Sequence, residues 1–275
     1  MHTIKKFDEG LEYLELTNDV MHAKIALQGA HIFEFNELLW LSDVAEFREG
    51  VAIRGGIPLC WPRFGSLDKT LTQHGFARTE MFELVAIDEL NSELTIVHMR
   101  LKDSSKTRKI WDKSFELDIV FELGENLKIG MKTTNRDSEA FTITEAFHSY
   151  FLVSDIKNVT IYGLENRTYF DALEEKKGLE KSAIKIDREI DRVYEGVDRD
   201  IILKDSQKEI VLTTKGSASA IVWNPWIDKA KRISGMRDDA YREFVCIESA
   251  NAFGDYRVLK PDETHSLSLE LLIKK

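Results

Sequence analysis

The stretch Phe115-Glu-Leu-Asp-Ile-Val-Phe-Glu-Leu-Gly-Glu-Asn-Leu-Lys-Ile-Gly-Met-Lys132 decides the fold class. Apolar residues occupy every second position from Phe115 to Leu123, and mostly acidic residues fill the positions between them. A period of two is that of a strand with one buried and one solvated face. Residues 124–126 have turn chemistry and the alternation resumes over residues 127–132, so we predict a β-hairpin.

The same alternation recurs elsewhere in the chain, over residues 267–273 and from Phe141 to Thr144. If the second of these strands continues, His148 shares its more polar face with Thr142, Thr144 and Tyr150. Residues 171–181 are charged, contain Gly178 and lack an apolar stripe, and we predict a surface loop there. No internal repeat, low-complexity segment or linker divides the chain. The sequence therefore predicts one large all-β antiparallel domain over residues 1–275, with few short helices.

Composition narrows the classes of function. Of the 275 residues, 43% are hydrophobic, which is enough for a sizeable core, and the net charge of -10 repels nucleic acids and anionic membrane surfaces. A few arginines can still bind a compact anion against this background. We see no signal peptide and no apolar run long enough for a membrane helix. Cys60 and Cys246 stand among apolar neighbours, as small buried residues do. These features favour a cytoplasmic protein.

Two segments interrupt the strand pattern. Residues 54–65, Arg-Gly-Gly-Ile-Pro-Leu-Cys-Trp-Pro-Arg-Phe-Gly, combine three glycines and two prolines with aromatic residues, and we predict an irregular, close-packed loop suited to building a site. Residues 244–248, Phe-Val-Cys-Ile-Glu, place a carboxylate after four apolar residues. This second pattern predicts a deeply buried strand that carries a charge at its end.

Glu248 and His148 are the candidates for proton transfer. A carboxylate beside a buried strand is poorly solvated, which raises its pKa and strengthens it as a base. The structural alternative for Glu248 is an ion pair with Arg242 or Arg257. On a polar strand face the pKa of His148 would stay near its ordinary value, and its imidazolium could donate a proton at neutral pH. Its alternative role is that of a half-buried histidine hydrogen-bonded to the backbone.

Candidate ligand-binding residues stand in residues 73–78 and in the irregular segment over residues 54–65. In Gln73-His74-Gly75-Phe-Ala-Arg78 a glycine allows close backbone approach to a ligand and an arginine follows the histidine by four residues. Arg54 and Arg63 add guanidinium groups in poorly solvated surroundings, where arginine commonly binds carboxylate or phosphate oxygens in a bidentate fork. A salt bridge to an acidic residue is the alternative for each arginine.

Two further segments carry groups that could contact a sugar. Asp191 could accept hydrogen bonds from sugar hydroxyls, or it could be a loop carboxylate. Residues 223–226, Trp-Asn-Pro-Trp, form a rigid aromatic turn whose rings pack in the core or provide a stacking wall, and core packing is the favoured interpretation.

His74, His148 and Glu248 are residue types that zinc prefers as ligands. They are dispersed, and the sequence has neither a His-x-His pair nor a His-x-x-x-His helix. We therefore expect acid-base chemistry without a metal or other cofactor.

Six segments in the same order resemble the glucose-6-phosphate 1-epimerase (hexose-6-phosphate mutarotase) branch of the aldose 1-epimerase family, and together they span most of the chain. The segments are Arg54-Gly-Gly-Ile-Pro, Gln73-His-Gly-Phe-Ala-Arg78, Phe147-His-Ser-Tyr-Phe151, Asp191-Arg-Val-Tyr194, Trp223-Asn-Pro-Trp226 and Val245-Cys-Ile-Glu248. The resemblance implies a large antiparallel β-sandwich of the galactose mutarotase-like kind, with a cleft across one sheet.

The resemblance also implies a role for each matched residue. It makes His148 the general acid, Glu248 the general base, and His74 a second histidine beside the ring and anomeric oxygens. Asp191 anchors sugar hydroxyls, and Gln73 lines the same cleft. Arg54 and Arg78 match the arginines of the phosphorylated-sugar branch. Arg63 stands where much of the family has an apolar or aromatic residue, and it is either a third phosphate ligand or a charge that faces elsewhere.

The resulting hypothesis is an isomerase that interconverts the anomers of a phosphorylated hexose, acting as a monomer on a small molecule. Two alternatives remain open from the sequence: a carbohydrate-sensing protein that binds without catalysis, and a glycoside-processing enzyme, which needs two facing carboxylates. Retention of both His148 and Glu248 favours the isomerase over the sensor.

Overall fold

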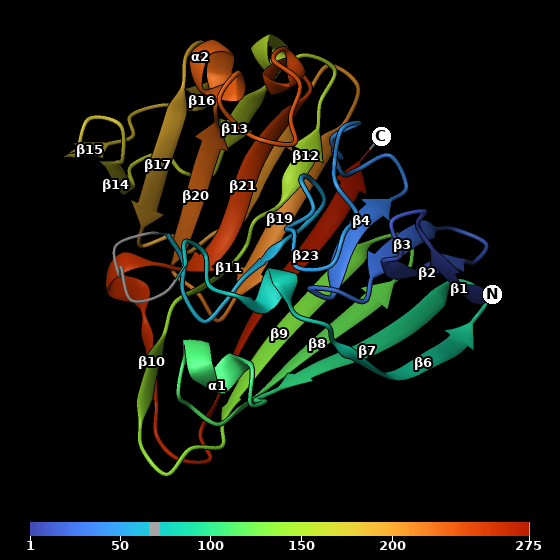
Figure 1. The fold of residues 1–275 in the computed structure, drawn as a ribbon. Coiled ribbons are helices and arrows are strands. Elements are labelled where there is room, and N and C mark those ends of the chain that lie inside the picture. The colour runs from blue at the N-terminus through green and yellow to red at the C-terminus, as the bar shows by residue number, and fades with distance from the viewer. Residues whose placement is uncertain (66–71, 275) are drawn as a thin grey trace.

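The computed structural model describes residues 1–65 and 72–274, and antiparallel sheets dominate it (Figure 1). The largest sheet has nine strands. In spatial order these are β16 (Ile184–Lys185), β13 (Thr160–Tyr162), β18 (Ile201–Lys204), β19 (Glu209–Lys215), β23 (Thr264–Lys274), β9 (Leu127–Asn135), β8 (Phe115–Leu123), β7 (Leu94–Lys102) and β6 (Glu83–Asn91).

A second sheet of eight strands carries the candidate site. Its order is β15 (Lys176–Leu179), β14 (Thr168–Asp171), β17 (Ile190–Glu195), β20 (Ser219–Asn224), β21 (Phe244–Asn251), β11 (Glu145–Phe147) and β5 (Leu59–Cys60), and β12 (Tyr150–Leu152) also pairs with β21.

Two smaller sheets and a few short helices complete the described part of the chain. The four-stranded sheet consists of β1 (His2–Lys6), β2 (Glu12–Thr17), β3 (His22–Ala26) and β4 (His31–Phe35), and the two-stranded sheet of β10 (Phe141–Ile143) and β22 (Arg257–Leu259). The α-helices are α1 (Thr107–Ile110) and α2 (Trp226–Ala230), and the 3₁₀ helices are η1 (Ala77–Thr79), η2 (Ile156–Asn158), η3 (Ala240–Arg242) and η4 (Phe253–Asp255).

The predicted hairpin is confirmed as β8 and β9, which pair in one uninterrupted register from Phe115 opposite Asn135 to Leu123 opposite Leu127. The apolar positions of this hairpin are buried, as the alternation requires. The C-terminal alternation is confirmed as well, because Leu267, Leu269 and Leu271 of β23 are fully buried.

The two large sheets enclose one hydrophobic core. A single cluster of buried side chains contains Ile119 and Leu269 from the nine-stranded sheet and Phe147 and Ile247 from the eight-stranded sheet. A hydrogen bond of 2.6 Å between the hydroxyls of Thr214 and Ser249 also joins the sheets. The predicted antiparallel β-sandwich is therefore confirmed, with one sheet free to present a face to ligands.

Residues 171–181 do not form the predicted surface loop. Most of the segment lies in a hairpin of β14 and β15 at the edge of the eight-stranded sheet, where Tyr169 stands opposite Gly178. The prediction was wrong because β15 is largely solvated, so its sequence needs no apolar stripe. Gly178 is explained by contact, since a Cβ there would lie 2.5 Å from the Tyr169 ring, which covers the glycine backbone.

The strand expected from Phe141 through His148 is interrupted twice, which divides it into β10, β11 and β12. β10 pairs with β22, whereas β11 and β12 both pair with β21. The backbone amide of His148 donates instead to the carbonyl of Pro58, at 3.0 Å. The expected shared face survives at its end, where the His148 ring stacks on that of Tyr150 with 4.9 Å between centroids.

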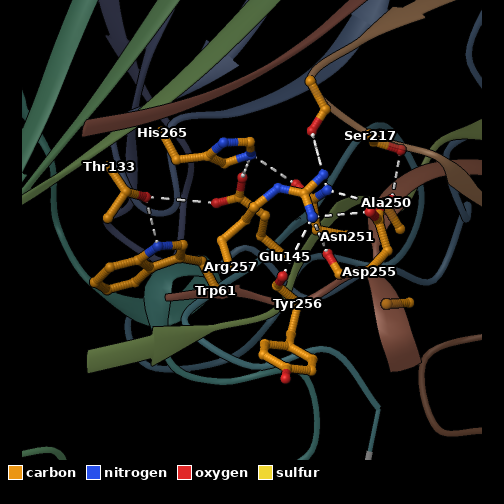
Figure 2. A network of polar contacts seen from close by, with 12 residues as sticks. Trp61, Thr133, Glu145, Ser217, Ala250, Asn251, Asp255, Tyr256, Arg257 and His265 are labelled. Atoms are coloured by element: carbon orange, nitrogen blue, oxygen red, sulfur yellow. Dashed lines mark hydrogen bonds and ion pairs between the residues drawn. The ribbon is translucent and has the colours of Figure 1, made fainter. Parts of the chain in front are cut away.

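A buried polar network around Glu145 of β11 joins the sheets (Figure 2). Trp61 Nε1 donates to Thr133 Oγ1 at 2.9 Å, and Thr133 Oγ1 donates to Glu145 Oε2 at 3.4 Å. On the other side of the carboxyl group, His265 Nε2 lies 3.4 Å from Glu145 Oε1 and 2.8 Å from Asn251 Oδ1. The network therefore fixes the strand that leads into His148 from both neighbouring layers.

Candidate active site

The register of the eight-stranded sheet gathers the candidate residues on one face. Tyr150 of β12 stands opposite Cys246 of β21, which stands opposite Trp223 of β20, which stands opposite Asp191 of β17. Directly opposed residues in antiparallel strands point to the same face of the sheet. Glu248 is two residues from Cys246 and shares that face.

His148 and Glu248 lie across from one another on this face. The pairing of Phe147 with Ser249 and that of Tyr150 with Cys246 belong to one register, and continuing it places His148 opposite Glu248. The distance from His148 Nε2 to Glu248 Oε1 is 3.4 Å. His148 is 8% exposed and Glu248 is 2% exposed, so both groups act in surroundings of low dielectric.

The strand over residues 244–248 is buried as predicted, but Glu248 lies within it and not at its end. The structural alternative for this carboxylate does not hold. The Arg257 guanidinium binds Asp255, and Arg242 Nε donates to the hydroxyl of Tyr241. Among the described residues, Glu248 Oε2 and His148 Nδ1 have no hydrogen-bond partner. The sheet thus brings together an acid and a base that each have an unused hydrogen-bonding atom.

Electrostatics perturbs both members of the pair. Burial raises the pKa of Glu248, and the negative charge of Asp191 raises it further. Burial lowers the pKa of His148 well below its ordinary value, with smaller contributions of the same sign from His74, Arg78 and Arg54. The expectation that His148 keeps an ordinary pKa is therefore wrong, because its ring is buried among those of Tyr150, Trp223 and His74.

His74 lies beside the pair, with 5.6 Å between its ring centroid and that of His148. Its backbone has φ of 65°, a left-handed conformation that is uncommon outside glycine and is found where structure fixes a functional side chain. Burial and the charges of Arg78 and Arg54 lower its pKa to about 3, so the ring is neutral. Its Nδ1 accepts from the amide of Gly65 at 3.2 Å, which leaves Nε2–H as a donor.

Gly75 explains how this loop comes so close to the sheet. A Cβ at Gly75 would lie 2.1 Å from the carbonyl oxygen of Trp61, and the residue has φ of 69°. Only glycine permits both the approach and the conformation. The predicted irregular loop over residues 54–65 is confirmed, because β5 is its only strand in the described residues.

The arginines occupy the loops around the pair. Arg54 is half-buried and donates from Nη1 to the Tyr150 hydroxyl at 3.3 Å, while Arg78, in η1, donates to the carbonyl of Gln73 at 3.0 Å. The charges of both lower the pKa values of His74 and His148, which places them at the site. Arg63 is half-buried in the first loop, and Gln73 is exposed in the second. The ligand-binding roles of all four residues stay predictions.

Asp191 has a partner that the sequence did not suggest. Lys229 Nζ, on α2, lies 3.6 Å from Asp191 Oδ2 and 3.2 Å from Glu189 Oε1. The same ammonium group stands over the Trp223 ring, 5.9 Å from its centroid. Lys229 belongs to the charged string Asp-Lys-Ala-Lys at residues 228–231, a pattern typical of an exposed surface segment.

The aromatic turn at residues 223–226 packs as predicted at its first position. Trp223 is buried, and its ring meets that of His148 edge to face at 5.8 Å. Asn224 holds the turn through hydrogen bonds to the carbonyls of Tyr241 and Phe244. Trp226 is only partly buried and packs beside Tyr241. Trp223 is therefore both a core residue and a neighbour of the candidate acid.

The described residues contain neither a cluster of metal-ligand side chains nor a membrane-spanning helix. No group of three or more His, Cys, Asp or Glu side chains among them could hold a metal ion. No helix in the part of the chain that the structure describes is long and apolar enough to cross a membrane.

A β-sandwich that presents a buried histidine–glutamate pair among arginines defines the class: an acid-base site on the face of an antiparallel sheet. Comparison with known proteins identifies the family, because residues 12–272 match the model for aldose 1-epimerase. The chain belongs to the aldose 1-epimerase family.

Relatives of known name agree with this membership. The chain is 36% identical over 261 residues to a protein of Cenchrus ciliaris provisionally named glucose-6-phosphate 1-epimerase, covering 88% of this chain and 78% of the relative. It is 32% identical over 271 residues to an Escherichia coli protein of the same provisional name, covering 95% and 90% of the two chains.

Solved structures agree as well. A crystal structure of a provisionally assigned mutarotase from Salmonella typhimurium superimposes with a TM-score of 0.93 at 30% identity, covering 100% of this chain and 94% of that one. A galactose 1-epimerase from Lactobacillus acidophilus shares the fold with a TM-score of 0.77 at 13% identity, covering 100% and 98% of the chains.

Proposed function

We propose that this protein is a mutarotase that interconverts the α and β anomers of a hexose 6-phosphate, with glucose 6-phosphate the preferred candidate. The observation that carries the proposal is the His148–Glu248 pair, two buried titratable groups 3.4 Å apart on one sheet face. Binding alone does not need an acid and a base in this position, whereas opening a sugar ring needs both.

The reaction requires one proton to leave and one to arrive. Glu248 removes the proton of the C1 hydroxyl while the imidazolium of His148 protonates the ring oxygen O5. The C1–O5 bond breaks with its electron pair on O5, and C1 becomes the aldehyde carbon. Rotation about C1–C2 followed by reclosure, with the two proton transfers reversed, gives the other anomer. Neutral His74 donates a hydrogen bond from Nε2 to the sugar oxygen beside it.

Substrate binding supports this distribution of charge. Burial alone disfavours the imidazolium of His148, and Arg54 and Arg78 disfavour it further. A phosphate dianion bound by those arginines offsets their charge, which favours the protonated form of His148. Binding of the phosphorylated substrate thus promotes protonation of His148, the group that then donates a proton to the sugar.

The remaining residues bind parts of the sugar that do not react. Arg54 and Arg78 hold the phosphate in charge-assisted hydrogen bonds, and Arg63 adds a third. Asp191 accepts from sugar hydroxyls, and Gln73 lines the same face. This remote binding fixes C1 and O5 between Glu248 and His148, so that proton transfer needs no further alignment. A cytoplasmic location and a monomeric state stay predictions.

A substrate panel tests the proposal. Exchange NMR on glucose, galactose and mannose, each with and without a 6-phosphate, measures the rate at which the anomers interconvert. We expect acceleration proportional to protein concentration and strongest for a 6-phosphate. Binding of sugar phosphates without faster exchange would support the sensor instead, and cleavage of an oligosaccharide would support the glycoside-processing enzyme.

A further inference from the structure

A hydrogen bond fixes the turn that leads into α2, the helix that carries Lys229. The amide of Trp226, the first residue of α2, donates to Asn224 Oδ1 at 2.9 Å, and Asn224 is itself fully buried. The Lys229 side chain is 32% exposed, so its ammonium group is partly withdrawn from water. A lysine on a free surface helix would not be restrained in this way.

The surroundings of Lys229 are acidic. Its ammonium contacts Asp191 and Glu189, and the carboxylate of Asp171 on β14 adds a repulsive charge to Asp191. Arg192, the next residue of β17, binds Asp171 and Glu180 instead. Among the described residues, Lys229 is therefore the cation whose side chain contacts Asp191.

Asp191 in turn acts on the candidate base. Its carboxylate shares a face with Glu248, and its charge raises the pKa of Glu248. The other titratable and charged groups around Glu248 and His148 are Arg78, His74, Arg54 and Tyr150, together with the buried thiols of Cys60 and Cys246. Lys229 therefore acts on Glu248 indirectly, because its ammonium group contacts Asp191 and the charge of Asp191 affects Glu248.

We propose that Lys229 is a positioning residue of the active site, which orients the Asp191 carboxylate toward the sugar and neutralises its charge so that Glu248 can act as a base near neutral pH. The proposal rests on the proposed mutarotase function and adds to it a residue that touches neither C1 nor O5. Its geometric basis is the contact of one ammonium group with Asp191, Glu189 and the Trp223 ring.

The sign of the expected effect follows from the charges. Removing the ammonium leaves Asp191 without the interaction that lowers its pKa, so that the pKa of its carboxyl rises. While Asp191 is ionised, its uncompensated charge also raises the pKa of Glu248. Both effects move the acid limb of kcat/KM toward higher pH, and a misplaced Asp191 raises KM.

The test compares pH profiles of kcat/KM for anomer exchange of glucose 6-phosphate. In Lys229→Met we expect the acid limb to move up by about one pH unit and KM to rise about 10-fold. Lys229→Arg keeps the charge and should restore the acid limb. Lys231→Met, which removes an exposed lysine just beyond the same helix, is the matched control and should leave the profile unchanged. Lys229→Gln gives a second measurement if the methionine variant does not fold.

Two measurements separate this role from a merely structural one. In an Asp191→Asn background, Lys229→Met should no longer move the acid limb, because the charge that it compensates is gone. Carbon-13 NMR should show that the pKa of the Asp191 carboxyl rises in Lys229→Met, a result that does not depend on activity. An active wild type with an unmoved acid limb and an unmoved Asp191 pKa overturns this inference alone. A wild type without exchange activity overturns the proposed function, and the Asp191 titration then still decides the contact.

Discussion

The buried carboxyl group of Glu145 makes the stability of the fold depend on pH. Its side chain is fully buried between the two sheets, and burial raises the pKa of its carboxyl from 4.5 to about 8, against smaller opposing effects of Thr133 and Arg257. The folded protein therefore holds this proton at neutral pH, whereas the unfolded chain releases it. The proton lies within the network of Figure 2, on β11, the strand that leads to His148.

The sign and size of the effect follow from linkage. Because the folded-state pKa of Glu145 is the higher one, its contribution to stability is complete below pH 4.5 and is lost as the pH rises toward 8. Each pH unit in this window lowers the free energy of unfolding by about 1.4 kcal/mol through this one group, or about 4 to 5 kcal/mol over the whole window.

Glu145→Gln removes the titration while keeping a donor and an acceptor for the Thr133 and His265 contacts. We expect the variant to gain stability relative to the wild type by about 1.4 kcal/mol per pH unit between pH 5 and 8. Urea unfolding followed by circular dichroism at several pH values measures this difference. Glu270→Gln, at an exposed position of β23, is the control and should track the wild type. A difference between Glu145→Gln and wild type that does not vary with pH would refute the reasoning.

Three further predictions concern the site and its scaffold. Arg54→Ala should raise KM for glucose 6-phosphate about 10- to 100-fold and leave KM for free glucose unaffected. The control is Arg48→Ala, which removes an exposed arginine paired with Glu46 and should change neither KM. Equal losses for both sugars would contradict a phosphate role. Glu248→Gln should raise Tm, increasingly so at higher pH, because a buried carboxyl with a raised pKa is removed; a lower Tm in thermal unfolding would count against this account. Gly50→Ala should lower the free energy of unfolding by about 1 to 2 kcal/mol, because Gly50 has a positive φ but open space for a Cβ. Gly75→Ala should lower it by much more, because its Cβ would also meet the Trp61 carbonyl. Similar losses in the two variants, measured by urea unfolding, would contradict the close approach to Trp61.

Sequence periodicity predicted the sandwich because burial of one strand face is a local property. The alternation from Phe115 to Leu123 could be read without knowing its partner, and the structure confirms the hairpin. The hairpin of β14 and β15 was missed because its edge strand, Lys176–Leu179, buries few side chains. Such a strand shows no alternation of apolar and polar residues.

The site itself was only partly predictable. The apolar run before Glu248 indicated a buried carboxylate, but its facing residue depends on a register that spans a hundred residues of sequence, from His148 to Glu248. The lowered pKa of His148 was missed because it depends on burial and on Arg54 and Arg78, which come from distant loops. Lys229 left no signal, since its partners Asp191 and Glu189 meet it only after α2 is placed over the sheet.

The central claim is that His148 and Glu248 act as one proton-transfer unit on a phosphorylated hexose. The most direct test is exchange NMR of glucose 6-phosphate anomers with the wild type, with His148→Asn, with Glu248→Gln and with the double variant. We expect a rate proportional to wild-type concentration, a loss of about 10²- to 10⁴-fold in each single variant, and little additional loss in the double variant because the two groups work together. Exchange no faster than in buffer for the wild type, or a double variant that keeps the wild-type rate, would contradict the claim.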